Sequence, residues 1–506
     1  MLDSANRIAK NTLLLYLRSF LVLLLSLYTS RKVLEVLGVE DYGLYNVIGG
    51  IVGLLSFLNT TMAATYQRYF NYEIGRNNYA ELKSLFHSSL SVQIVFAIII
   101  IILAETLGLW FLKTKLTIPV DRFQVAIAVY HISIVSFAVS MFQAPYHALI
   151  IAYEKMGIFA FISVVDAVLK LAMVLVLPRF SGDHLVIYAL MMLSIIAFCT
   201  LLYIILSRSK IGEYKFALDW DKKRFKSLLN FGTWGMVDSL SYTLKSQGIN
   251  ILLNLFFGPV VNAARGIAYQ IMNAVNQFVA SFQTSFRPQM MQLYAEGDMP
   301  SMYKLYYVST KISFYMIWCI ALPIMLNVSM ILNLWLGEAN VPAYTADFTI
   351  LVLLTSTISA YANPTSCIAY ATGNIKWFTI FVSGLNLLIV PIAYIVLHNG
   401  GNPQSALVVS LIVTVLVQLM RIIVVKNIEP SFSIRVYATK VVCPTLLVAF
   451  VSVLLPLMVK HVIPEGIWSS ALVCVIAVLS VLICAFLLGL ENDEQQILIS
   501  KLKKKK

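Results

Sequence analysis

The sequence predicts an all-α, polytopic membrane protein with about 14 transmembrane helices. Of its 506 residues, 59% are hydrophobic and only 12% are charged, whereas a soluble protein carries roughly 25% charged residues. Apolar runs of about 20 residues, the length that crosses a bilayer, recur to the end of the chain. A weak internal repeat further predicts two six-helix lobes related by a parallel repeat, followed by two C-terminal helices.

The first apolar run, from Asn11 to Ser30, is too long for a signal peptide, and no small-residue cleavage site follows it. We therefore expect it to be the first spanning helix. The other runs follow it at short intervals, with short loops between them. The expected spans lie near 12–36, 43–67, 84–112, 120–148, 156–178, 185–206, 228–256, 260–286, 305–334, 345–371, 376–397, 404–425, 437–459 and 466–489.

Positive charges predict the orientation of these spans. Most of the 37 Lys and Arg residues, including Lys304 and Lys311, fall in segments on one side of the spans. The positive-inside rule places that side in the cytoplasm. Both termini are then cytoplasmic, and the net charge of +13 needs no nucleic-acid partner to explain it.

The internal repeat relates two segments of similar order. VLGVEDYGLYNVIGG (36–50) corresponds to FFGPVVNAARGIAYQ (256–270), with Gly38 aligned to Gly258 and no gap as far as Leu85 and Leu305. Later, each half has a proline, Pro145 or Pro364, and a few residues after it the sequence Ile-Ala-Tyr, at 151–153 and 368–370. The repeat predicts an N-terminal six-helix lobe (1–206), a cytoplasmic basic linker (207–227), a C-terminal six-helix lobe (228–425), helices 13 and 14 (426–489) and a basic cytoplasmic tail (490–506).

These motifs resemble a known family. The opening helix, LGVEDYGLYN after it, TYQRYFNYEIGR at the inner end of the second span and the Pro-to-Ile-Ala-Tyr element are similar to bacterial polysaccharide-biosynthesis flippases. These proteins form the O-antigen (Wzx-type) branch of the multidrug/oligosaccharidyl-lipid/polysaccharide (MOP) exporter superfamily. The resemblance covers nearly the whole chain.

The resemblance implies a V-shaped, two-lobed transporter in the bacterial inner membrane. It implies that an undecaprenyl-diphosphate-linked oligosaccharide moves from the inner to the outer leaflet, for assembly of a polymer such as O-antigen or capsule. Membrane lipid and the polysaccharide polymerase machinery are the other expected partners. No cofactor is expected, and the choice between H⁺ and Na⁺ as a coupling ion stays open.

Charged residues inside the spans are the candidate site. A charge at the centre of a spanning helix costs about 2.5–3.5 kcal/mol on insertion scales, and a cationic, hydrated cavity for a diphosphate would offset that cost. The residues expected to bind the anionic headgroup are Arg18, Lys245 and Arg265. The alternative for these three residues is snorkelling or a structural ion pair.

Three further charges are expected in the cavity or in ion coupling: Asp238, Asp166 and Lys170. Asp238 corresponds to Arg18 in the repeat, which suggests that the two approach each other. Asp166 and Lys170 have i,i+4 spacing, so an ordinary structural pair is the alternative. The aromatic residues Tyr66, Tyr69, Phe70 and Tyr72 are expected in an interfacial belt rather than at the substrate.

Two other functions remain open. A cation-coupled multidrug antiporter of the same superfamily would favour acidic residues in its cavity, whereas cations are more numerous here. A membrane glycosyltransferase or polymerase would need a larger outer loop than this chain offers, so we expect no enzyme. The six cysteines show no metal-binding spacing and are expected to be small hydrophobic residues.

Overall fold

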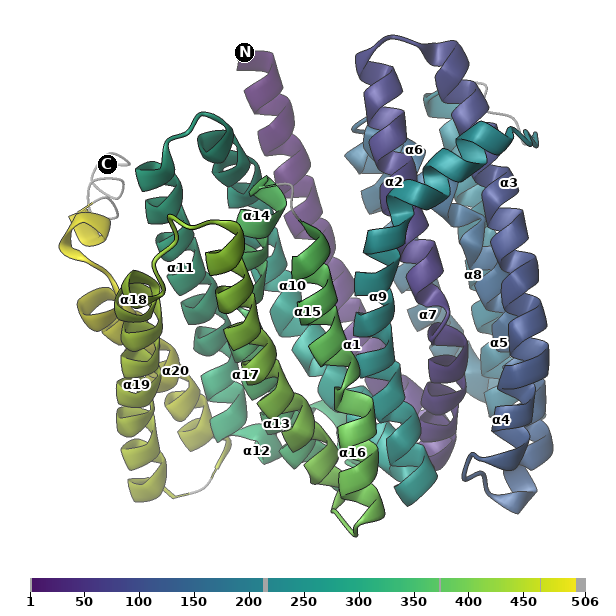
Figure 1. The fold of residues 1–506 in the computed structure, drawn as a ribbon. Coiled ribbons are helices and arrows are strands. Elements are labelled where there is room, and N and C mark those ends of the chain that lie inside the picture. Colours follow the sequence, from purple (N-terminus) through teal and green to yellow (C-terminus); the bar gives the residue numbers. More distant parts are fainter. Residues whose placement is uncertain (1, 213–216, 373–374, 465, 497–506) are drawn as a thin grey trace. The chain divides into compact units, whose positions relative to one another are not determined.

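A computed structural model of the chain describes residues 2–212, 217–372, 375–464 and 466–496. The predicted basic tail (490–506) therefore lies mostly outside the described residues. Every long element in the described ranges is a helix, and no strand occurs there (Figure 1). The chain divides into two compact units, residues 1–266 and 267–506.

The first unit is built from nine helices and the start of a tenth. These are α1 (Leu2–Gly53), α2 (Ser56–Gly75), α3 (Tyr79–Leu103), α4 (Leu109–Thr114), α5 (Phe123–Met141), α6 (Gln143–Ala152), α7 (Met156–Val176), α8 (His184–Lys210), α9 (Lys222–Phe257) and the first residues of α10 (Pro259–Ala295). A π-helical turn, Ala104–Gly108, joins α3 to α4 without a break.

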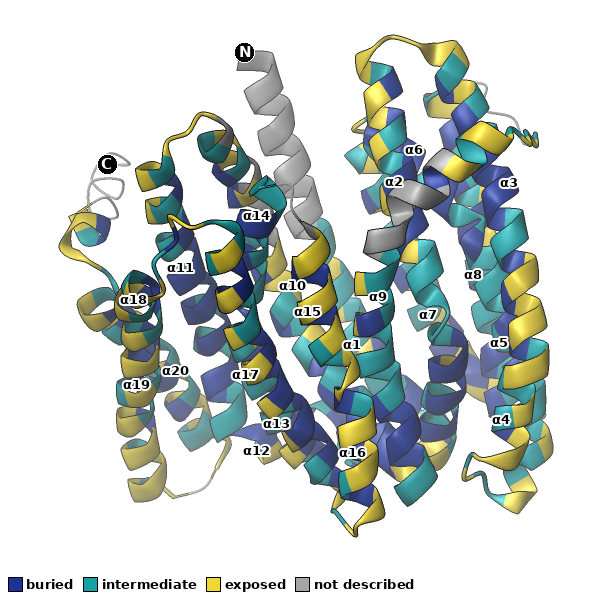
Figure 2. Cartoon of the chain, in the orientation of Figure 1, coloured by how far each residue is buried: buried dark blue, intermediate teal, exposed yellow. Residues whose placement is uncertain are grey.

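The second unit contains the rest of α10 and the helices after it. These are α11 (Met299–Leu326), α12 (Val328–Leu336), α13 (Thr345–Ser359), α14 (Ala362–Thr372), α15 (Ile375–Leu387), α16 (Ile389–His398), α17 (Pro403–Ile428), α18 (Ile434–Tyr437), α19 (Cys443–Val462) and α20 (Ile467–Cys484). Helix α11 is the most enclosed span, with 61% of its apolar stretch buried against 28% for α19. Figure 2 shows this contrast between α11 and the largely exposed α19.

Fewer helices than predicted are long and apolar enough to span a membrane in the described part of the chain. By length and composition, ten helices of the described residues are apolar enough to cross a bilayer, or up to eleven if the bent pair α1–α2 counts as one span. The expected number was about 14. Helices α9 and α10 are long enough to span a membrane but are not apolar enough, because polar and charged residues recur along both. The chain is nevertheless an all-helical, polytopic membrane protein.

The repeat offset, the spacing from Gly38 to Gly258, recurs in local backbone geometry. Gly38 has φ 76° and ψ 170°, and Gly258 has φ 81° and ψ −174°, a region that is essentially restricted to glycine. At the same offset, Asn77 and Gly297 both have positive φ. The next residues of each half, Asn78 and Asp298, both cap the helix that follows. The aligned segments therefore share their helix breaks as well as their sequence order.

The boundary between the units differs from the predicted linker. Helix α8 continues to Lys210 and α9 begins at Lys222, so both ends of 207–227 are helical. Arg224 Nε lies 2.8 Å from Glu81 Oε1 of α3, and the backbone N–H of Asp219 donates to Ser91 Oγ of α3 at 3.1 Å. The second half of this segment is therefore docked on α3, and α9 belongs to the first unit.

Gly43 of α1 allows the start of α10 to approach closely, which gives a testable prediction. A Cβ atom at Gly43 would lie 1.8 Å from the carbonyl oxygen of Pro259, whereas one at Gly49 would meet nothing within 4 Å. Gly43→Ala should therefore destabilise the protein by about 1–3 kcal/mol, measured as a lower melting temperature in detergent. Gly49→Ala on the same helix should be neutral or stabilising. Equal melting temperatures would contradict the close approach.

Candidate functional site

Arg18 of α1 lies at a junction of four helices. Its guanidinium carbon is 4.5 Å from the ring centroid of Phe159 on α7, a cation–π distance. Its Nε is buried and has no hydrogen-bond partner in the described part of the chain. Tyr203 of α8 and His147 of α6 both interact electrostatically with it. The arginine therefore packs against aromatic groups, with no carboxylate of a described residue paired to it.

A polar face runs along α9. Asp238 and Tyr242 are exposed, Tyr242 to 67%, and Lys245 is partly exposed. Their i, i+4, i+7 spacing places the three on one face of the helix. Ser241, next to them in sequence, is buried and donates to the Val237 carbonyl. Part of the unusual polarity of α9 therefore comes from side chains on one exposed face of the helix.

The expected approach of Arg18 and Asp238 is not found in this conformation. No hydrogen bond or ion pair joins the two side chains, both of which lie in described parts of the first unit. Phe159 occupies the position against the Arg18 guanidinium instead. Their approach, which the repeat suggests, therefore stays a prediction for other conformations.

Arg265 is engaged within the protein. Its side chain lies at the start of α10 and is buried, with 6% of its surface exposed. Nη2 donates to the carbonyl oxygen of Ser246 on α9 at 2.5 Å and to Ser246 Oγ at 3.3 Å. In this conformation Arg265 connects α9 to α10, which matches the structural alternative for this residue.

Asp166 and Lys170 form the ion pair that their spacing predicts. Lys170 Nζ lies 2.7 Å from Asp166 Oδ2, and the Cys199 thiol approaches Asp166 Oδ1 at 3.9 Å. Tyr203 interacts electrostatically with both Asp166 and Arg18. The pair is thus a neighbour of the Arg18 junction, which the sequence did not indicate.

A buried ion pair in the second unit was not expected. Lys311, predicted to lie in a cytoplasmic segment, is buried in α11, and its Nζ is 2.6 Å from Glu494 Oε2. Their side chains are only 1% and 9% exposed. The position of Lys311 inside the predicted span 305–334 was a signal that it leaves the solvent. Its partner could not be found from sequence, because Glu494 lies after α20, 183 residues further along the chain, and only the packing of distant helices brings the two together.

A second unexpected cluster lies around Arg122 in the first unit. Nη1 is 2.5 Å from Asp183 Oδ2, and Nε is 2.8 Å from Asp41 Oδ1. Asp183 also caps α8. Burial of Asp183 opposes its ionisation, but hydrogen bonds from Arg122 and from two backbone N–H groups outweigh burial, so the pKa of this carboxyl is below its ordinary value. The cluster joins α1 to the residues that directly precede α5 and α8.

The predicted aromatic belt is only partly correct. Tyr66 and Phe70 are fully buried and pack with Phe86 and Tyr146 in the core of the first unit. Tyr72 is 54% exposed and stacks under the Arg76 guanidinium. The helix that carries these residues therefore directs two of them inward, a choice that depends on how α2 packs on α3 and α6.

Glu105 and His131 form another pair within the membrane-spanning region. Glu105 lies in the π-helical turn Ala104–Gly108, and His131 Nδ1 is 2.9 Å from Glu105 Oε1. The hydroxyl of Tyr130 donates to the Ala104 carbonyl at 2.7 Å. Among the residues that the structure describes, no group of three or more His, Cys, Asp or Glu side chains could hold a metal.

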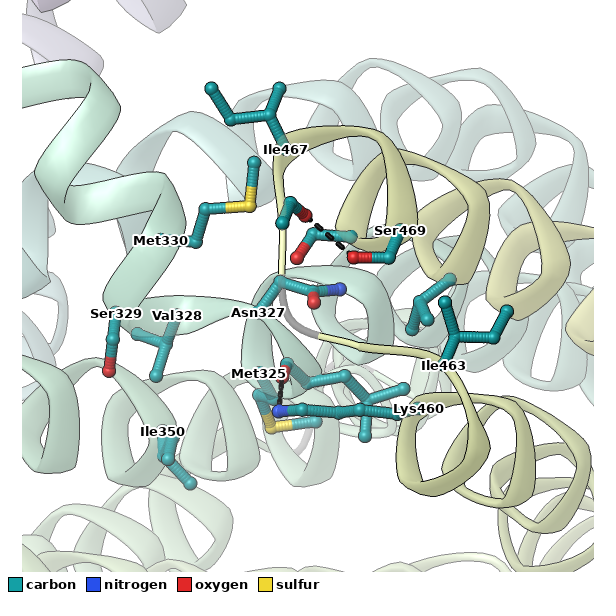
Figure 3. A pocket seen from close by; sticks show the side chains of 14 residues that line it. Met325, Asn327, Val328, Ser329, Met330, Ile350, Lys460, Ile463, Ile467 and Ser469 are labelled. Carbon is teal, nitrogen blue, oxygen red and sulfur yellow. Dashed lines mark hydrogen bonds between the residues drawn. The ribbon is translucent and has the colours of Figure 1, made fainter.

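Figure 3 shows a cavity of about 620 Å³ within the second unit, where the break between α11 and α12 meets the start of α20. Apolar side chains such as Met325, Met330 and Ile467 line it together with polar ones. Lys460 Nζ donates to the Leu326 carbonyl, and Asn327 Nδ2 donates to Cys474 Sγ at 3.3 Å. The protein itself therefore supplies partners for these polar groups.

The chain shares its fold with solved membrane transport proteins. The chain is similar to the lipid II flippase MurJ in an inward closed conformation, with 12% identity, a TM-score of 0.67 and coverage of 94% of this chain and 98% of that one. An inward-facing MATE multidrug transporter of the MOP superfamily gives 15% identity, a TM-score of 0.65 and coverages of 81% and 96%. A variant of the MATE transporter VcmN from Vibrio cholerae has 13% sequence identity and a TM-score of 0.57, with coverage of 85% of this chain and 99% of that one.

Residues 8–294 match the family model described as polysaccharide biosynthesis protein. The chain therefore belongs to the polysaccharide biosynthesis protein family. The solved proteins of this fold that are named above are transporters or a flippase rather than enzymes, which agrees with the expectation that this chain is not an enzyme. No individually curated protein matches the sequence.

Proposed function

We propose that this protein is a flippase that moves an undecaprenyl-diphosphate-linked oligosaccharide from the cytoplasmic to the outer leaflet of the bacterial inner membrane. The glycan would then enter a surface polysaccharide such as O-antigen or capsule. Membership of the polysaccharide biosynthesis family supports this proposal. So does the similarity, over nearly the whole chain, to a structure named as a lipid II flippase.

Arg18 is the observation that carries the proposal. A half-buried guanidinium inside an apolar helix is costly, yet no carboxylate of a described residue pairs with it and its Nε is without a partner there. An anionic ligand would offset that cost, because charge-assisted hydrogen bonds to phosphate oxygens are strong. A diphosphate headgroup supplies such oxygens, while the prenyl chain remains in lipid.

Transport would follow alternating access by two six-helix lobes within a fourteen-helix arrangement, with helices 13 and 14 appended. Lys245 would add a second cation for the headgroup from the polar face of α9, and Arg265 would do so after release from Ser246. Asp238, Asp166 and Lys170 are candidates for cavity lining or for coupling to H⁺ or Na⁺. Both termini would be cytoplasmic, and the polysaccharide polymerase machinery would receive the product.

Deletion of the gene in the native host tests this function directly. Lipid-linked oligosaccharide should accumulate on the cytoplasmic face of the membrane, and expression of the wild-type protein should clear it. Chemical identification of the trapped glycan would name the substrate. Unchanged lipid-linked intermediates together with a normal surface polysaccharide would contradict the proposal.

A cation-coupled multidrug antiporter is the second candidate, because several similar structures are MATE transporters. This function predicts that deletion increases sensitivity to cationic drugs without accumulation of lipid-linked sugar. The same deletion strain therefore separates the two functions. A membrane glycosyltransferase or polymerase would instead lose polymer while translocated oligosaccharide persists.

A further inference from the structure

Three side chains from three other helices surround the Arg18 guanidinium. Its carbon lies 4.5 Å from the ring centroid of Phe159. The imidazole of His147 packs edge-on against the same ring, with centroids 5.0 Å apart, and against Tyr203 at 6.1 Å. Arg18 comes from α1, His147 from α6, Phe159 from α7 and Tyr203 from α8. All four residues belong to the first compact unit.

These groups have the chemistry of an oxyanion site. A guanidinium stacked on an aromatic ring keeps its N–H edge available for a planar acceptor. The neutral imidazole and the phenol each carry one further donor. Asp166, which interacts electrostatically with Tyr203, is bound by Lys170 at 2.7 Å and contacted by the Cys199 thiol. The cluster therefore presents donors and positive charge, while its neighbouring carboxylate already has a cation.

The depth of the cluster fits the leaflet from which the headgroup would enter. Phe159 lies in the first turn of α7, which begins at Met156, and His147 lies near the end of α6 at Ala152. Tyr203 is two turns before the end of α8 at Lys210. The positive-inside rule places these helix ends in the cytoplasm. The residues from α6, α7 and α8 thus lie in the cytoplasmic half of their helices, on the side from which the headgroup would enter.

We propose that Arg18, His147 and Tyr203 together form the loading site for the diphosphate of the prenyl-linked substrate, with Phe159 holding the guanidinium in place. This inference rests on the proposed flippase function and adds two residues to it. His147 and Tyr203 donate to phosphate oxygens, and Arg18 supplies the charge. A diphosphate carries more negative charge than a monophosphate and spreads its acceptor oxygens over two phosphorus centres, so a diphosphate lipid binds more tightly to these three groups than a monophosphate lipid.

Binding to the full-length protein in detergent tests this site. The probes are undecaprenyl diphosphate, undecaprenyl monophosphate, phosphatidylglycerol and inorganic pyrophosphate. Tyr203→Phe removes only the hydroxyl, and His147→Leu removes the imidazole donors. Each change should raise the Kd for undecaprenyl diphosphate roughly tenfold, which is about 1.4 kcal/mol. His147→Gln, which retains an N–H donor, should bind more tightly than His147→Leu.

Two matched controls separate ligand contact from damage to the fold. Tyr188→Phe alters another buried tyrosine of α8, one that packs against Tyr45, and should leave the Kd unchanged. His131→Gln alters the histidine paired with Glu105 and should also leave it unchanged. All variants should elute and melt like the wild type before their Kd values are compared.

The outcomes distinguish this inference from the function on which it rests. If Arg18→Ala abolishes binding but Tyr203→Phe and His147→Leu bind as the wild type does, the three-residue site is wrong and the flippase function stands. If phosphatidylglycerol or inorganic pyrophosphate binds as tightly as undecaprenyl diphosphate, the cluster is a general phosphate site and the loading role is overturned. If the wild type binds no undecaprenyl diphosphate, both proposals fail.

Discussion

Replacement of Glu494 by alanine should destabilise the protein by roughly 3–5 kcal/mol, because it leaves a buried ammonium without its counter-charge. Lys311 is 1% exposed in the most enclosed helix of the second unit, and its Nζ is 2.6 Å from Glu494 Oε2. Glu494 also accepts the backbone N–H of Glu491 at 2.8 Å. Thermal and denaturant unfolding in detergent would measure the loss.

The neighbouring carboxylate provides a matched control. Asp493 lies 3.7 Å from Lys304, and the two side chains are 78% and 57% exposed. Exposed pairs of this kind contribute about 0–1 kcal/mol, so Asp493→Ala should change stability little. The double variant Lys311→Met with Glu494→Gln should recover most of the lost stability, since no uncompensated charge remains. Similar losses for Glu494→Ala and Asp493→Ala would show that burial of this pair is unimportant.

Replacement of Arg18 by alanine should reduce transport of the lipid-linked oligosaccharide at least tenfold, which is about 1.4 kcal/mol. The loss arises because the positive charge that meets the diphosphate is removed, while the aromatic surface of Phe159 remains. Arg18→Lys should retain partial activity, since an ammonium keeps the charge but loses the planar, bidentate donor edge. The rate of clearance of trapped lipid-linked sugar after re-expression gives the measurement.

Arg31 offers a control arginine on the same helix. It pairs with Glu35 at 3.0 Å at a partly exposed position, and Lys32 contacts the same carboxylate at 2.6 Å. Arg31→Ala should therefore leave transport close to the wild-type rate. Wild-type transport by Arg18→Ala would exclude the idea that this arginine meets the headgroup.

Much of the fold could be predicted because its signals are local. Apolar runs gave the spanning helices, and the shortage of charged residues excluded a soluble protein. The alignment of Gly38 with Gly258 located two helix breaks with nearly equal dihedral angles. That correspondence is readable because only glycine adopts such a conformation without strain. The pairing of Asp166 with Lys170 could also be predicted, because the two residues are four positions apart on one helix.

The candidate site was only partly predictable. Arg18 was identified by its charge within an apolar run, but Phe159, His147 and Tyr203 give no such signal, because each is an ordinary residue of its own helix. Arg265 has the same charge signal as Arg18, yet it is bound to Ser246. Whether an intramembrane arginine is available or engaged thus depends on which helix packs beside it.

The sequence by itself determined that the chain is a polytopic helical membrane protein and that its helices break at Gly38 and Gly258, because composition, hydropathy and glycine geometry act over short stretches. Only the tertiary structure decided the partners of the charged residues, from the aromatic junction at Arg18 to the burial of Lys311 against Glu494. The physical reason is that an ion or a stacked ring is stabilised by atoms that approach in space from distant helices, and the linear order of residues does not contain that distance.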